Sequence, residues 1–120
     1  MAGRRERQDV DPCEAHHCDA GVVRAFSVLG KRWNGMILAT LSSGAGNFSE
    51  LRRSLAPITD SVLSDRLNEL VEAGLVSRSV RDGHPPGVSY ALTGAGAAVV
   101  PVLDQLASWA RDHLATSVGR

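Results

Sequence analysis

The chain alternates apolar stripes at helical spacing with short segments rich in glycine, serine and proline. Apolar residues recur three and four positions apart over residues 19–29, and a second such stripe follows over 32–41. This spacing places the apolar side chains on one face of a helix, so both segments are predicted to be helical. Gly30 is the predicted C-cap of the first helix, and the segment "SSGAG" ends the second.

The segment "NFSELRRSL" predicts a third, short helix. Ser49 is its predicted N-cap, and Glu50 suits the first turn because a carboxylate is favourable at the positive end of the helix dipole. Leu51 and Leu55 are four residues apart and share a face. Pro57 closes the segment, since its ring cannot continue a helix.

A fourth helix is predicted over residues 60–73, with Thr59 as N-cap and Asp60 in the first turn. An apolar stripe forms one side of this helix, and the opposite side carries Ser61, Ser64, Asp65, Asn68 and Glu72. Gly74 ends the helix, and Leu75 can fold back onto Leu70 in a Schellman-type contact.

Two runs of strand-forming residues, "LVSRSV" and "VSYALT", flank the turn-rich segment "RDGHPPG". They predict a β-hairpin over residues 75–93 with a tip of six or seven residues. A last helix is predicted over 94–114, capped by Thr93, with a wide apolar stripe. Pro101 lies inside it, so this helix either bends there or begins near that point.

This order of elements predicts a mainly α protein with a small β-hairpin, an α+β winged helix-turn-helix. The domain covers residues 13–120 and follows a flexible, polar arm over 1–12. In such a fold the third helix braces the fourth, which enters the DNA major groove, about 12 Å wide. The hairpin, or wing, reaches the flanking backbone or minor groove.

The composition excludes some classes of function but does not identify one. The 120 residues contain 13 basic and 13 acidic side chains, so the net charge is zero and gives no general attraction to nucleic acid. No apolar run approaches the roughly 18 residues that cross a bilayer, and the first residues lack a signal-peptide core. We therefore expect a cytoplasmic protein without membrane contact. No catalytic constellation is present, so we expect neither an enzyme nor a cofactor.

Three motifs carry a resemblance to a known family: "FSELRR", "L-x-x-R-L-x-E-L-x-x-x-G-L-V" and "PP-x-V-x-Y-x-L-T-x-x-G". In this order and spacing the chain, from Cys18 to about Leu114, resembles the HxlR family of bacterial transcription regulators, relatives of the MarR group. The resemblance implies a homodimer that binds double-stranded DNA as a repressor or activator, and we expect a repressor. Two-fold symmetry would place the paired recognition helices about 34 Å apart on a pseudo-palindromic operator.

The resemblance also implies which residues meet the partner subunit and the DNA. The helices at 19–29 and 94–114 form the dimer interface, with Val22, Phe26, Val102, Leu106 and Trp109 as candidates. The candidate DNA contacts are Arg32, Ser49, Arg52, Arg53, Thr59, Ser61, Ser64, Asp65, Arg66, Asn68, Arg78, Arg81 and His84. The family often has Gln or Lys where Asp60 and Asp65 stand, and Arg where Gly87 stands.

Several of these side chains have a structural alternative. Arg66 either contacts DNA or forms an internal ion pair with Glu69 or Asp65. One of Arg52 and Arg53 braces the helix-turn-helix while the other meets phosphate. The whole domain has an alternative too, a winged-helix protein-interaction module without specific DNA binding.

The segment "CEAHHC" contains zinc-type ligands, but its six residues are too cramped for a standard closed site, so no metal is expected. In parts of the resembling family a cysteine at the position of Cys18 senses oxidants or electrophiles. Here a helix N-terminus would lower the thiol pKa, while Asp19 would raise it. Cys18 is therefore a candidate regulatory thiol with Cys13 as its resolving partner, or else a small packed residue. A small-molecule effector could bind between Trp33 and Trp109, which otherwise serve the core or the dimer interface.

Overall fold

The structure, a computed structural model, describes residues 19–44, 46–83 and 87–115. The chain divides after Lys31 into two compact units. The first unit contains helix α2 (Ala20–Leu29), whose N-cap Asp19 accepts a hydrogen bond from the amide of Gly21. The Gly30 amide donates to the Phe26 carbonyl over 3.0 Å, so this helix ends as predicted. The predicted flexible arm over residues 1–12 lies outside the described residues.

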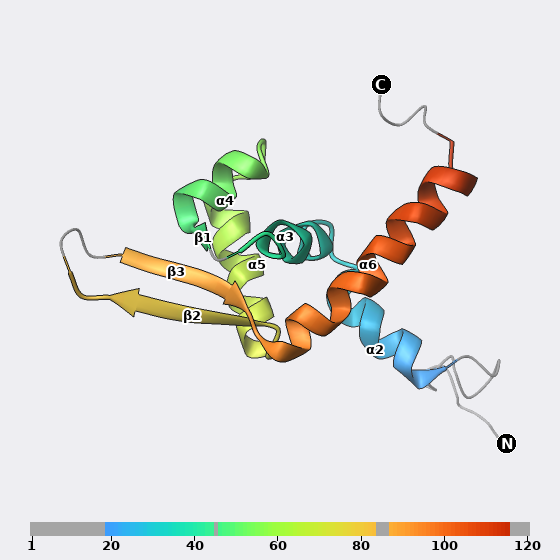
Figure 1. Cartoon of the computed structure of the whole chain (residues 1–120), viewed down its shortest axis with the longest axis horizontal. Coiled ribbons are helices and arrows are strands. Elements are labelled where there is room, and N and C mark those ends of the chain that lie inside the picture. Colours follow the sequence, from blue (N-terminus) through green and yellow to red (C-terminus); the bar gives the residue numbers. More distant parts are fainter. Residues whose placement is uncertain (1–18, 45, 84–86, 116–120) are drawn as a thin grey trace, which may run out of the picture. The chain divides into compact units, whose positions relative to one another are not determined.

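The second unit holds the winged-helix elements in their predicted order (Figure 1). They are α3 (Asn34–Leu41), β1 (Gly46–Asn47), α4 (Phe48–Ser54), α5 (Asp60–Glu72), β2 (Val76–Arg81), β3 (Gly87–Leu92) and α6 (Gly94–His113). The strands form one antiparallel sheet in the order β1-β3-β2. The predicted α+β fold class is confirmed, and the two-residue strand β1 is an addition to it.

The core of this unit is built from the apolar faces of its helices and the base of the hairpin. Leu63, Leu67 and Leu70 of α5 are fully buried, together with Ile37 and Leu38 of α3. Burying an aliphatic side chain of this size contributes about 1.5–3 kcal/mol, so the three leucines fix the rotation of α5 about its axis. The opposite face of α5 is thereby turned to solvent.

Both ends of α5 lie where the sequence predicts them. The Thr59 hydroxyl accepts a hydrogen bond from the Val62 amide over 3.2 Å. At the other end Gly74 has a φ of +82°, the left-handed conformation that glycine adopts most easily. The Leu75 amide donates to the Leu70 carbonyl and the Gly74 amide to the Val71 carbonyl, the two bonds of a Schellman motif.

The N-cap of α4 differs from the prediction. Asn47 takes this position, and its side chain accepts from the Glu50 amide over 2.8 Å. The Glu50 carboxylate in turn accepts from the Asn47 amide over 3.0 Å, which completes a capping box. Asn47 pairs with Ser89 in the sheet and is held in the extended conformation that an N-cap requires. The predicted cap Ser49 therefore lies inside the first turn of the helix.

The hairpin also has a shorter tip than predicted. Arg81 and Gly87 are paired in the ladder between β2 and β3, so only residues 82–86 connect the strands. The predicted tip of six or seven residues was wrong because it counted these ladder residues as loop. Figure 1 shows the two strands extending as a ribbon beyond α4 and α5.

Helix α6 begins at Gly94, and the alternative start near Pro101 is wrong. The start is set by Thr93, whose hydroxyl accepts from the Gly96 amide over 3.1 Å and donates to the Gly74 carbonyl over 2.6 Å. The bond to Gly74 ties the beginning of α6 to the end of α5. Within the described ranges, no helix combines the length and apolar character that a bilayer crossing demands.

Candidate nucleic-acid interface

The exposed face of α5 is a straight polar stripe. Ser61, Asp65, Asn68 and Glu72 follow one another at intervals of four, three and four residues, which aligns them along the helix, and all four are exposed. Ser64 is exposed beside them. The predicted assignment of these side chains to the outer face is therefore confirmed, while their contact with DNA stays a prediction.

An ion pair connects α4 with the first residue of α5. Arg52 Nε lies 3.2 Å from Asp60 Oδ1 across the turn that contains the cis Ala56–Pro57 bond. Of the two arginines that the sequence left open, Arg52 is therefore the one paired across the turn, and Arg53 is exposed beside it. Their roles as brace and phosphate contact stay predictions. Asp60 was expected only to complement the helix dipole. Its bond to Arg52 depends on the turn and has no signature in local spacing.

Arg66 forms the ion pair that was its alternative interpretation. Its Nη2 lies 3.3 Å from Glu69 Oε2, one helical turn along α5. The side chain is only 22% exposed, and its Nε is buried without a hydrogen-bond partner among the described residues. Arg66 therefore lies between the exposed stripe and the core. Its own contact with DNA remains untested.

The wing carries two arginines on opposite faces of the hairpin. Arg78 stands opposite Tyr90 in the ladder and shares a face with it, whereas Arg81 stands opposite Gly87 on the other face. A Cβ atom at Gly87 would lie 3.0 Å from Arg81 Nη2, so glycine leaves the space that this guanidinium occupies. Both arginines are exposed. His84, the third predicted wing contact, lies outside the described residues.

The remaining predicted contacts, Arg32, Ser49 and Thr59, are exposed. The Arg32 guanidinium carbon is 5.1 Å from the ring centroid of Trp33, a cation–π arrangement that leaves Arg32 exposed. Ser49 is exposed in the first turn of α4, and Thr59 is exposed next to α5, with its hydroxyl used as the cap.

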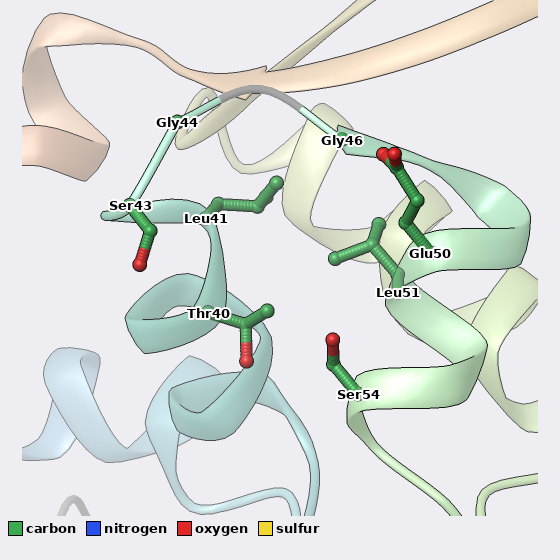
Figure 2. Close-up of a pocket in the computed structure, with 8 residues that line it drawn as sticks. All are labelled: Thr40, Leu41, Ser43, Gly44, Gly46, Glu50, Leu51 and Ser54. Carbon is green, nitrogen blue, oxygen red and sulfur yellow. The ribbon is translucent and has the colours of Figure 1, made fainter.

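A cavity of about 170 Å³ opens between the end of α3 and α4. Figure 2 shows the side chains of Leu41 and Leu51 pointing toward each other, and Thr40 and Ser54 also line the cavity. Neither Trp33 nor Trp109 lines this cavity, so it differs from the effector pocket that the sequence suggested.

The structure describes the candidate dimer residues but not the candidate regulatory cysteines. The five candidate dimer residues are exposed on their helices, Val22 and Phe26 on α2 and Val102, Leu106 and Trp109 on α6. Cys13, Cys18 and the rest of "CEAHHC" lie outside the described residues. Across the described segments no group of three His, Cys, Asp or Glu side chains could hold a metal ion.

Comparison with known proteins gives a consistent picture. A protein-family model described as HxlR-like helix-turn-helix matches residues 28–118 of the sequence. The regulator YodB of Bacillus subtilis is 40% identical over 86 residues, 72% of this chain and 77% of YodB. An uncharacterised HTH-type transcriptional regulator of Methanothermobacter thermautotrophicus is 39% identical over 87 residues, 72% of this chain and 66% of that protein.

Solved structures of YodB from B. subtilis are similar in fold as well. Its reduced form superposes with a TM-score of 0.74 at 35% identity and covers 81% of this chain and 95% of that one. Its diamide-treated form gives 0.70 at 36% identity, over 82% and 97% of the two chains. The relatives named here are HTH-type transcriptional regulators.

Proposed function

The chain belongs to the HxlR-like helix-turn-helix family of transcriptional regulators, and from this we propose that it is a homodimeric repressor of a pseudo-palindromic operator. Helix α5 enters the major groove of each half-site, and the wing formed by β2 and β3 contacts the flanking backbone. The observation that carries this proposal is the polar stripe of α5, which is turned outward by a fully buried apolar face.

The surroundings of α5 support the same role. The Arg52–Asp60 pair and the Schellman motif at Gly74 hold the helix at both ends. Arg53 on α4 and the wing arginines Arg78 and Arg81 are exposed and positively charged, which suits contacts to phosphate oxygens. Arg32, Ser49 and Thr59 are exposed as well and are proposed as further contacts.

Dimerisation is proposed through α2 and α6. Val102, Leu106 and Trp109 lie four and three residues apart on α6, so they form an apolar stripe, and Trp109 is 52% exposed. Val22 and Phe26 form a similar exposed pair on α2. Apolar side chains gathered on one face in this way favour association with another protein surface. A second copy of the chain is the partner that a two-fold operator requires.

We propose that a thiol-reactive signal releases the repressor. The solved forms of YodB, reduced and diamide-treated, describe a relative studied with a thiol oxidant. In this chain Cys18 directly precedes the N-cap of α2, and Cys13 is the second thiol. A small molecule bound elsewhere on the domain is the alternative signal.

A salt titration tests the DNA-binding function. The full chain is titrated with a fluorescent duplex from the promoter of its own gene at several salt concentrations. A repressor predicts a log–log slope of several units, because each neutralised phosphate contributes about 0.9. A flat or absent response favours the second candidate, an interaction module, for which the carboxylates on the exposed face of α5 are the supporting observation.

A further inference from the structure

The exposed face of α5 lacks the group that most often recognises bases. Arginine and lysine donate to guanine O6 and N7 in the commonest specific contact in the major groove. Arg66 is the one basic residue in α5, and its guanidinium is bound to Glu69 on the flank of the helix. The stripe that would face the bases consists of hydroxyls, an amide and carboxylates.

A carboxylate restricts base recognition severely, because at neutral pH it only accepts hydrogen bonds. The major-groove edges of guanine and thymine present the acceptors N7, O6 and O4 to it, and these repel it. Cytosine differs from the other bases because its own major-groove edge presents only a hydrogen-bond donor, the amino group N4. Adenine offers an amino group beside an acceptor, a pattern that an amide matches better than a carboxylate.

Asp65 is the carboxylate in the position to make such a contact. It lies in the second turn of α5, in the half of a recognition helix that approaches base edges, and its neighbours on that face, Ser61 and Ser64, are small. Glu72, the other carboxylate of the stripe, is the last residue of the helix. We therefore expect the Glu72 carboxylate to lie farther from the bases than the Asp65 carboxylate.

We infer that Asp65 selects a cytosine in each half-site of the operator by accepting a hydrogen bond from its N4 amino group. This rests on the proposed DNA-binding function and adds to it the base that the helix prefers. The carboxylate discriminates largely by rejecting the other bases, while the exposed arginines Arg53 and Arg78 supply the attraction to the backbone.

The test is selection of bound duplexes from a random-sequence library by the full chain, followed by sequencing. The variants are Asp65→Asn and the matched control Glu72→Gln, which removes the same charge from the same face. The wild type is expected to select one C·G pair in each half-site. Discrimination at that position should be about 5- to 150-fold, the usual effect of one mismatched base pair in a specific site.

Asp65→Asn should move the preference at that position from cytosine to adenine, because an amide pairs with adenine N6 and N7. It should also tighten binding to unselected DNA, since a charge that repels phosphate is lost. Glu72→Gln should also bind unselected DNA more tightly, but it should select the same motif as the wild type. Both positions are exposed and both substitutions keep the side-chain shape, so the fold is preserved.

The outcomes separate this inference from the proposed function. If the wild type selects a motif and Asp65→Asn selects the same motif, Asp65 does not recognise a base, and the inference fails while the repressor function stands. If Glu72→Gln shifts the selected motif as much as Asp65→Asn does, the shift results from the lost charge alone. This outcome would also overturn the inference. If the wild type enriches no sequence at all, the DNA-binding function itself fails.

Discussion

Arg52 and Asp60 join the two helices of the helix-turn-helix through an ion pair of 3.2 Å, and the neighbouring Arg53 is exposed outside it. The two adjacent arginines thus have different surroundings, although the sequence presents them as equivalent. The side chains of Arg52 and Asp60 are 50% and 71% exposed, and exposed pairs of this kind contribute at most about 1 kcal/mol to folding. We expect it to act on DNA binding, through the position of α5, more than on stability.

Replacement of these two arginines should therefore affect DNA binding in different ways. Arg53→Ala should reduce the slope of log affinity against log salt by about one, because one phosphate contact is lost. Arg52→Ala should weaken binding with little change in this slope, since the arginine already has a carboxylate partner. Fluorescence anisotropy over a salt series measures both. Equal slopes for the two variants would contradict the assignment of Arg52 as the brace.

Arg66→Ala should mainly lower the free energy of unfolding, with a smaller effect on DNA binding. The side chain is largely buried and paired with Glu69, so its loss removes an i,i+3 pair and the packing of its aliphatic stem. We expect a loss of about 0.5–1 kcal/mol in urea unfolding. Arg66→Met keeps the stem and should recover part of this loss. A variant that unfolds like the wild type but binds DNA much more weakly would instead establish Arg66 as a DNA contact.

Features that depend on neighbouring residues were predictable from the sequence. Thr59, Thr93 and Gly74 mark helix ends through bonds to residues at most five positions away, and the structure has all three as predicted. The order of elements followed from the same local signals. This sufficed for the winged-helix fold.

Features that depend on distant residues were not predictable. Strand β1 has two residues and exists because Gly46 and Asn47 pair with Tyr90 and Ser89. That pairing holds Asn47 extended. Its role as cap in place of Ser49 does have a local signature, Glu50 three residues later, which the sequence analysis overlooked. The choice between Arg52 and Arg53 likewise depends on the turn between α4 and α5, which brings Asp60 to Arg52. Local spacing contains no such information.

The apolar stripe on α6 predicts a dimer that one charge can break. Leu106→Glu places a carboxylate in the middle of Val102, Leu106 and Trp109 and should convert the dimer to a monomer, since an unpaired charge is costly to bury. Ser108→Glu, also exposed but on another side of α6, is the control and should remain dimeric. Sedimentation velocity distinguishes the two states. A wild-type protein that sediments as a monomer at micromolar concentration would contradict the proposed interface.

Thiol sensing predicts that diamide releases the protein from its operator and that Cys18→Ser prevents this release. Cys13→Ser should still react, because the sensing thiolate at Cys18 remains, although the oxidised form can no longer close a bond to Cys13. Anisotropy before and after diamide, followed by addition of dithiothreitol, measures release and recovery. Release that persists in Cys18→Ser excludes this cysteine as the sensor.

Two glycines at the start of α6 should respond in opposite ways to the same substitution. A Cβ atom on Gly96 would lie 2.1 Å from the Leu75 carbonyl oxygen, far inside van der Waals contact, so backbone must move in Gly96→Ala. We expect a loss of about 3 kcal/mol or more, because overpacking against fixed backbone exceeds the usual cost of an added methyl group. Gly94, two residues earlier, has open space around it. Gly94→Ala should be neutral or stabilise the helix by up to about 1 kcal/mol through its higher helix propensity. Thermal and urea unfolding of both variants measure the contrast, and similar stabilities would show that α6 does not approach the end of α5 as closely as the Thr93–Gly74 bond indicates.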